Sequence, residues 1–443
     1  MASRSVPPRA PGAWPLLGHA PTLMRRPLDF MRSLADLGDV VRVQLGMVNA
    51  YVVTHPELVH QMLVTDAREY SRGLAHSRSR THFGNGLVFS DGEIHRLRRR
   101  MIQPEFRHAS LARHTSVMKS AVADVTATWR HGKPLEMTDE MAALALETVT
   151  RSLFTDLTED SARAIQRSVP ILMRGGIQRV VAPLWTARLP LPVNRRFRRA
   201  LSDVGVVVDN VISASRSGRD NCGDLLSTLL HARGEDGRTL SDQEIQDEIV
   251  AFYMAGVETS SSALAWLFYE IGRNPGMEDR LHSELDSVLD GRTPEYGDLP
   301  RLEYLGRIVS EVLREYSIWF QMRRTRRPVR LGSVRLPAGA QMIYSPYLLH
   351  HDPRWFPEPD RFDPDRWLPE RVQDIPRHAF MPFGAGSHTC IGGNFAVVEY
   401  MTDLAVICSQ WRLRPAPGHA VHKEIHATVH PGRLVMIPER RHR

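Results

Sequence analysis

Cysteine is scarce in this sequence, with Cys222, Cys390 and Cys408 as the three thiols among 443 residues. So few cysteines, in an odd number, exclude a disulfide framework and a zinc site with four cysteine ligands. Cys408 lies in an apolar stretch typical of a buried helix face, and Cys222 has no informative neighbours. We therefore expect thiol chemistry at one or two positions at most.

Long apolar runs are also absent, since none reaches the roughly 18 residues that span a bilayer. Residues 1–11 contain arginine and proline but no apolar core, which is not typical of a secretory signal. We therefore expect a cytoplasmic protein with no membrane partner. The chain has 42% hydrophobic and 24% charged residues, no internal repeat and no linker-like segment, which predicts one globular domain over residues 1–443.

Lysine is scarce too, because Lys119, Lys133 and Lys423 are three of the 57 basic residues and the other 54 are arginine. The net charge is 57 − 50 = +7, which suits a polyanion or an acidic protein as a partner. The basic residues are scattered along the chain, and so strong a preference for arginine indicates coding bias. We therefore expect no nucleic acid, while an acidic protein remains a candidate partner.

Apolar residues recur with helical spacing over most of the chain. This pattern predicts helices over residues 93–103, 110–131, 138–154, 160–176, 195–216, 241–274 and 391–411. The longest begins with a capping-box pattern at Ser241 and Glu244 and is about 50 Å long. Short strands are expected over residues 40–45, 50–53, 329–331 and 341–344, and long loops over residues 73–91 and 351–369. The fold class is therefore mainly α with small β-sheets.

The segment 380–396, FMPFGAGSHTCIGGNFA, places Cys390 in a glycine-rich loop directly before a predicted helix. A helix N-terminus carries partial positive charge and free N–H groups, which stabilise a thiolate. The glycines of this segment allow backbone amides and a flat cofactor to approach closely. The pattern by itself leaves two interpretations open, namely a thiolate metal ligand or a buried structural cysteine beside a helix end.

The spacing Phe383-x-x-Gly386-x-x-x-Cys390-x-Gly392 resembles the heme-binding signature of the cytochrome P-450 superfamily. The resemblance implies that Cys390 is the axial thiolate ligand of heme b, iron protoporphyrin IX. It places Phe383 beside the cysteine and His388 at a heme propionate. Thiolate donation to iron favours cleavage of the O–O bond. The resemblance also implies the triangular, mainly α fold of this superfamily.

A second motif, AGVETS at residues 255–260 in the longest predicted helix, resembles the oxygen-activation motif of the superfamily. The resemblance implies that Glu258 and Thr259 are catalytic and deliver protons to dioxygen. Gly256 weakens the helix, so the Thr259 hydroxyl can replace a helix hydrogen bond. The alternative is an amphipathic helix with a solvated Glu258, although this acid interrupts an apolar stretch where acids are rare.

Glu311 and Arg314 form an E-x-x-R pattern, in which positions i and i+3 share one helix face. The pattern alone is uninformative because it occurs by chance on solvated helices. In the superfamily it belongs to a buried Glu–Arg–Arg network that supports the cysteine loop. The resemblance assigns the third position of this network to Arg361, in the sequence Pro359-Asp360-Arg361-Phe362.

Further basic residues are candidates for the heme propionates. His95 and Arg99 are four residues apart on a predicted helix, at the spacing of the superfamily's heme-contacting helix. Alignment with the superfamily also selects Arg323, with Arg324 as a nearby rival. Guanidinium groups suit carboxylate pairing. A solvated basic face is the alternative for the other arginines between residues 96 and 100.

The resemblance implies a monooxygenase that inserts one atom of dioxygen into a bulky, largely apolar natural product. Electrons would come from NAD(P)H through ferredoxin reductase and a ferredoxin, which a basic surface attracts. The N-terminal RAPGAWPLLGHA resembles terpene-tailoring bacterial members of antibiotic and other secondary metabolism, with polyketides and macrolides as rival substrates. We expect a monomer. Two other functions stay open: a peroxide-using or rearranging heme-thiolate enzyme, and a non-catalytic heme-binding sensor.

Overall fold

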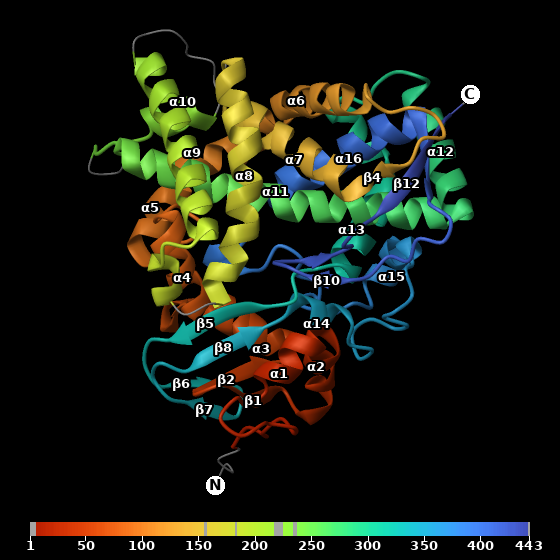
Figure 1. The fold of residues 1–443 in the computed structure, drawn as a ribbon. Coiled ribbons are helices and arrows are strands. Elements are labelled where there is room, and N and C mark those ends of the chain that lie inside the picture. Colours follow the sequence, from red (N-terminus) through yellow and green to blue (C-terminus); the bar gives the residue numbers. More distant parts are fainter. Residues whose placement is uncertain (1–5, 155–156, 182–183, 217–224, 234–236, 442–443) are drawn as a thin grey trace. The chain divides into compact units, whose positions relative to one another are not determined.

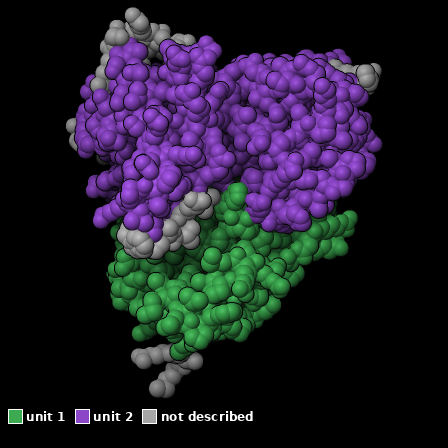
Figure 2. All heavy atoms as spheres, viewed as in Figure 1, with its two compact units in different colours: residues 1–77, 310–390, 425–429 green, residues 78–309, 391–424, 430–443 purple. Residues whose placement is uncertain are grey.

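The computed structural model describes residues 6–154, 157–181, 184–216, 225–233 and 237–441, so that Cys222 lies outside the described residues. The chain forms two compact units, which Figure 2 shows in different colours. Unit 1 comprises residues 1–77, 310–390 and 425–429, and unit 2 comprises residues 78–309, 391–424 and 430–443. Each unit is therefore assembled from stretches that are far apart in the sequence.

Unit 1 is built around a five-stranded sheet (Figure 1). Its strand order is β1 (Val40–Leu45), β2 (Val48–Val53), β8 (Gln341–Tyr344), β5 (Gln321–Thr325) and β3 (Tyr70–Arg72). β2 and β8 are parallel, and the other neighbours are antiparallel. The unit also contains α1 (Ala20–Arg25), α2 (Pro27–Ser33), α3 (Pro56–His60), α14 (Pro346–His350), α15 (Pro369–Val372) and the hairpin of β6 (Val329–Leu331) and β7 (Val334–Leu336). Apolar residues of these strands and helices form one core cluster.

Unit 2 is mostly helical. Its helices are α5 (Gly92–Ile102), α6 (His108–Thr126), α7 (Met137–Leu153), α8 (Glu159–Val181), α9 (Pro192–Arg216), α10 (Leu225–His231), α11 (Asp242–Arg273), α12 (Pro275–Leu289) and α16 (Gly393–Gln410). A three-stranded sheet has the order β4 (Leu135–Glu136), β12 (Val435–Arg440) and β9 (Trp411–Pro415). Along the chain, α4 (Leu74–Phe83) and α13 (Glu303–Glu315) run from one unit into the other, and β10 (Glu424–Ile425) pairs with β11 (Val429–His430).

The long helix α11 has the start and stop that the sequence predicts. Ser241 and Glu244 make both hydrogen bonds of a capping box. Pro275 follows the helix and occupies the first position of α12, where proline is tolerated because its missing N–H is not needed. α11 packs against α7, and a Cβ atom at Gly256 would lie 3.1 Å from Cγ2 of Val149. Glycine therefore permits the close approach of these two helices.

The predicted fold class is confirmed, and three local predictions are wrong. Residues 74–83 form α4, although their polar composition predicts a loop. The helix predicted over residues 110–131 ends at Thr126 as α6. α12 was not predicted, because Pro275 was interpreted only as a stop. Among the described residues, none of the helices combines the length and apolar character that a membrane crossing requires.

Candidate active site

Cys390 lies in an ordered loop of unit 1, two residues before the N-cap of α16. Its side chain is exposed, whereas Cys408 is buried within α16. The Cys390 backbone N–H donates to the Phe383 carbonyl over 2.9 Å, which closes the loop around the cysteine. Gly386 has φ +71°, and a Cβ atom there would lie 1.9 Å from the Leu63 carbonyl oxygen. Glycine at this position is therefore required by the packing of the loop.

Basic side chains gather in the same unit. Arg72 and Arg323 are paired across β3 and β5, and Arg323 is 6% exposed with its guanidinium 5.5 Å from the centre of the Tyr344 ring. Burial, and then the charges of Arg72, Arg323 and His388, lower the pKa of His76 well below its usual value. Basic side chains clustered in this way suit an anion such as a carboxylate. The rival Arg324 is exposed.

His76 and Arg72 were not predicted from the sequence. Arg72 is the last residue of β3 and His76 lies in α4, in a stretch of mixed polar residues that carries no motif. The signal that identifies them is the antiparallel pairing of β3 with β5, which brings Arg72 opposite Arg323. That pairing joins segments about 250 residues apart, so sequence spacing could not reveal it.

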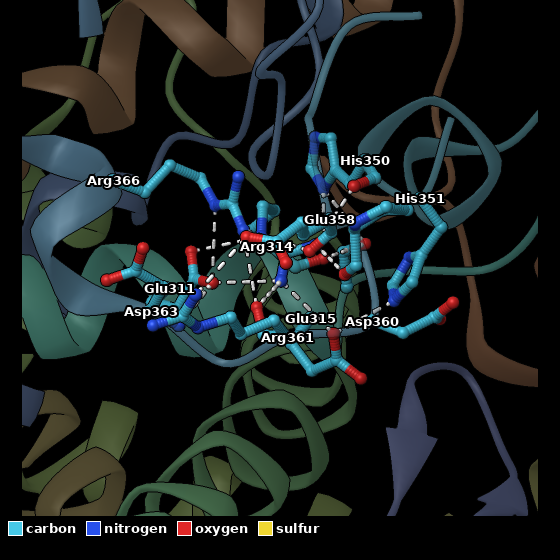
Figure 3. Close-up of polar contacts among 12 residues, drawn as sticks. Glu311, Arg314, Glu315, His350, His351, Glu358, Asp360, Arg361, Asp363 and Arg366 are labelled. Atoms are coloured by element: carbon cyan, nitrogen blue, oxygen red, sulfur yellow. Dashed lines mark hydrogen bonds and ion pairs between the residues drawn. The ribbon is translucent and has the colours of Figure 1, made fainter. Parts of the chain in front are cut away.

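Glu311 and Arg314 form a buried ion pair, as their spacing predicts (Figure 3). The Arg314 Nε and Nη2 atoms donate to the two Glu311 carboxylate oxygens over 3.0 and 2.9 Å. Both side chains are 0% exposed. Although burial opposes it, the nearby Glu311 and Glu315 raise the pKa of Arg314. Arg314 is therefore charged, and its other N–H groups donate to the carbonyls of His350 and Pro359.

The prediction that Arg361 is the third side chain of this network is wrong. Its side chain is 65% exposed and pairs with Glu358, while only its backbone carbonyl accepts from Arg314. Arg366 takes that position: it is 3% exposed, and its Nε lies 3.4 Å from Oε1 of Glu311. The loop turns between the two arginines and directs the second one inward, which the motif alone does not show.

His350 connects this network to the cysteine loop. Its Nε2 accepts from the backbone N–H of Met381 over 3.0 Å, so that the ring proton lies on Nδ1. Nδ1 then donates to the Arg314 carbonyl or the Ser317 hydroxyl, at 3.3 and 3.1 Å. Burial, and then the charges of His351 and Arg314, lower the pKa of His350 well below its usual value. His350 is therefore a neutral bridge, and no sequence motif marks it.

The predicted catalytic residues of α11 lie in a continuous α-helix. Glu258 and Thr259 are both partly exposed, in contrast to their neighbours Val257 and Ser260. The Thr259 hydroxyl donates to the Ala255 carbonyl over 2.7 Å, one turn earlier. This is the side-chain contact that the sequence predicts, and it competes with the backbone bond of the helix.

His95 and Arg99 lie one turn apart on α5 in unit 2, with His95 2% exposed and Arg99 partly exposed. The prediction of a solvated face is wrong for Arg98. Arg98 is 3% exposed and pairs with the buried Glu248 over 2.6 Å. Arg96 and Arg100 are exposed, as that alternative predicts.

Two buried acids of α16 have no counterpart among the predicted site residues. Glu399 is 1% exposed and accepts from the Ser260 hydroxyl over 2.6 Å. Asp403 is 0% exposed, and neither of its oxygens has a hydrogen-bond partner among the described residues. Burial raises the pKa of Glu399 to about 7, and burial followed by the Glu399 charge raises that of Asp403 well above its usual value.

Almost the whole chain matches one known protein family. The family model described as cytochrome P-450 matches residues 7–441, which include Cys390 and both other motifs. The chain belongs to the cytochrome P-450 family. As a cytochrome P-450 it is a monooxygenase with heme b as its cofactor, as the cysteine motif predicts. The family match spans stretches of both compact units.

Several curated relatives of this cytochrome P-450 are similar over almost their whole length. Cyclooctat-9-en-7-ol 5-monooxygenase of Streptomyces melanosporofaciens is 43% identical over 99% of this chain and 98% of its own. Cyclooctatin synthase of the same organism is 42% identical over 98% and 95%. Pentalenene oxygenase of Streptomyces avermitilis is 39% identical over 96% and 95%. A solved cytochrome P-450DA heme domain shares the fold, with a TM-score of 0.87, 24% identity and 98% coverage of both chains.

The residues of unit 1 fit this cofactor. An exposed thiol lies in a glycine-containing loop of this unit, and the charges of Arg72, Arg323 and His388 all act on His76 in the same unit. A thiolate is a suitable ligand for heme iron, and basic side chains are suitable partners for its two propionates. The chemistry of these donors therefore matches heme b.

Proposed function

We propose that this cytochrome P-450 is a terpene-tailoring monooxygenase of secondary metabolism, in which the Cys390 thiolate would hold the heme iron. The observation that carries the proposal is its 39–43% identity, over nearly the whole chain, to three enzymes, of which two are named for the terpenoids they oxidise. Heme b, when bound, supplies the site at which dioxygen is reduced and cleaved. The protein's own residues bind the cofactor, orient the substrate and supply the protons.

In this proposal the basic residues hold the cofactor's carboxylates. His388 and Arg323 of unit 1 bind propionates, together with Arg72 or His76, which the sequence did not select. His95 and Arg99 on α5 have the same role. Phe383 packs beside Cys390, to whose N–H it is joined by a 2.9 Å backbone hydrogen bond.

Glu258 and Thr259 are proposed to hold and move the protons that reduction of dioxygen consumes. The Thr259 hydroxyl is already oriented, because it donates to the Ala255 carbonyl over 2.7 Å. Rotation about one side-chain bond releases this hydroxyl as a donor, and Glu258 is the nearest acid along the helix that can replace the proton. Glu311 and Arg314, with Arg366 in place of Arg361, keep a structural role.

The ligand assignment is tested by replacing the thiol. We expect Cys390→Ser to lose the red-shifted band of the reduced carbon-monoxide complex, which reports a thiolate ligand. Cys408→Ser is the matched control, because Cys408 is 4% exposed in α16 and burial raises the pKa of its thiol to about 12. A band that persists in Cys390→Ser, or that disappears in Cys408→Ser alone, would refute the assignment.

The substrate class is tested by a spectral titration of the purified protein. We expect a shift from low to high spin with polycyclic terpene hydrocarbons and terpene alcohols. Macrolides and linear polyketides are the comparison set. A shift with the comparison set and none with the terpenes would contradict the terpene assignment and leave the monooxygenase chemistry in place.

We further propose that the chain acts as a monomer, as one domain, with a ferredoxin as its electron donor. The supporting feature is the net charge of +7, which attracts an acidic partner. Turnover with a ferredoxin and its reductase is expected to fall as salt rises from about 50 to 500 mM, because screening weakens docking. Turnover that hydrogen peroxide supports equally well without ferredoxin would favour the peroxide-using alternative.

A further inference from the structure

Three parts of unit 2 meet at a single carboxylate, that of Glu248 on α11. Its Oε1 accepts from Nη1 of Arg98 on α5 over 2.6 Å. Its Oε2 accepts from the backbone N–H of Leu87, in the segment between α4 and α5, over 2.7 Å. Glu248 is 0% exposed and Arg98 is 3% exposed. The carboxylate therefore connects α11 to a helix and to a loop at the same time.

The loop side of this connection is close-fitting. The preceding residue, Asp247, accepts from the Asn85 N–H over 2.7 Å. A Cβ atom at Gly84 would lie 2.1 Å from Oδ1 of Asp247, and one at Gly86 would lie 2.3 Å from the Asp247 carbonyl oxygen. The segment thus lies directly on α11, held by two carboxylates and two backbone N–H groups.

The helix side of the connection is a buried ion pair. Besides Glu248, Arg98 has a second, longer contact with Glu244 at 3.4 Å. Buried ion pairs contribute little net stability, because desolvation of the charges offsets their attraction, whereas removal of one partner is costly. Burial even raises the pKa of Glu248 in spite of Arg98. A pair of this kind is better explained by the geometry that it fixes than by stability.

We propose that Glu248 is a positioning residue, which fixes α5 through Arg98 and, together with Asp247, fixes the path of residues 84–90 through the N–H groups of Leu87 and Asn85. The inference rests on the proposed function, in which α5 presents His95 and Arg99 to heme. His95 and Arg99 flank Arg98 on the same helix. One carboxylate therefore controls a cofactor-binding helix and the loop that precedes it.

The two connections are separable by mutation. Arg98→Met/Glu248→Gln removes both charges of the pair but keeps an amide oxygen that can accept from Leu87. Asp247→Ala removes the second loop contact and leaves the ion pair intact. Arg96→Met is the matched control, since Arg96 is an exposed arginine on the same helix. Arg98→Lys keeps the charge but loses the forked contact with Glu244 and Glu248, so it replaces the double variant if that variant does not fold.

The readouts are the rate of heme transfer to apomyoglobin and the affinity for two azoles. The double variant is expected to lose heme about tenfold faster, as when a residue supporting a metal ligand is removed. The resemblance to the superfamily places residues 73–89 at the substrate pocket. Asp247→Ala is therefore expected to bind clotrimazole, a bulky apolar azole, about fivefold more weakly, the equivalent of one hydrogen bond. Its affinity for imidazole and its heme transfer should be unchanged.

The inference is overturned if the folded double variant, or Arg98→Lys in its place, loses heme at the rate of Arg96→Met. The part of the inference that concerns residues 84–90 is overturned if Asp247→Ala binds clotrimazole with the affinity of the parent. Failure of the proposed function gives a different result, because the parent itself would then lack the thiolate-type carbon-monoxide band whatever the variants do.

Discussion

Unit 1 and unit 2 both contain buried acidic side chains, and the partners of Glu311 differ from those of Glu399 and Asp403. Glu311 in unit 1 accepts two hydrogen bonds from Arg314, one from the Trp367 indole N–H and one from the Asp363 backbone. In unit 2, the Ser260 hydroxyl is the donor that reaches the pair of Glu399 and Asp403, and no cation among the described residues is within hydrogen-bond distance of either acid.

The difference shows that burial alone does not set the charge of an acid. A carboxylate surrounded by guanidinium and N–H donors stays ionised, because those donors replace the water that it loses. Two neighbouring carboxyls without such donors cannot both ionise, so they retain a proton to higher pH. The network around Glu311 is therefore expected to depend on its ion pairs, and the pair of Glu399 and Asp403 on the pH.

The largest expected effect is in the network of unit 1. Glu311→Gln removes one of the two acids that contact the buried, charged Arg314 and leaves Glu315 at 3.2 Å, and the expected cost is about 3–5 kcal/mol of unfolding free energy. Arg366→Ala should also lower the unfolding free energy. Arg361→Ala should change it by less than about 0.5 kcal/mol, because the Arg361 side chain is exposed. Chemical denaturation of the three variants measures this. Equal losses for Arg361→Ala and Arg366→Ala would restore the original prediction for Arg361.

An intermediate effect is expected at His350, which joins the network to the cysteine loop. His350→Phe keeps a ring of similar size but leaves the Met381 N–H without an acceptor, at a cost of about 1–3 kcal/mol. The expected result is a larger fraction of the reduced carbon-monoxide complex without the thiolate-type band. His350→Asn, which offers an acceptor, should recover part of the band. If both variants retain the parental spectrum, His350 does not position the loop.

The smallest effect is expected in unit 2, and it depends on pH. Because the pKa of Glu399 is raised to about 7 and that of Asp403 is also raised, the folded protein keeps protons that the unfolded chain releases above about pH 4.5. Stability therefore falls as the pH rises from about 5 to 8. Asp403→Asn removes one of these protons, and the loss between pH 5 and pH 8 should shrink by about 1–3 kcal/mol.

The matched control for this pH effect is Asp160→Asn, since the Asp160 side chain is 92% exposed. Thermal unfolding at pH 5, 6, 7 and 8 gives the slopes for the parent and both variants. Identical slopes for Asp403→Asn and the parent would show that Asp403 is ionised in the folded protein, and the contrast between the units would then disappear.

Local patterns in the sequence predicted the helices whose apolar periodicity is strong, and they failed where one residue has two roles. Pro275 ends α11 and begins α12, so a proline taken as a stop concealed the next helix. Residues 74–83 are helical in spite of seven polar or basic residues, which shows that tertiary contacts can override weak local preference. The path of the loop decides that the Arg366 side chain is buried and the Arg361 side chain is exposed, and the local pattern does not show this path.

The sequence by itself determined the family, the capped start of α11 and the pairing of Glu311 with Arg314, and it selected Cys390 as the proposed thiolate ligand. These features follow from short-range spacing, which fixes helix faces and loop geometry. The tertiary structure decided which arginine completes the network, which basic groups surround His76 and what Glu248 connects. These depend on segments up to about 250 residues apart, whose contacts arise only when the burial of apolar side chains brings distant elements together.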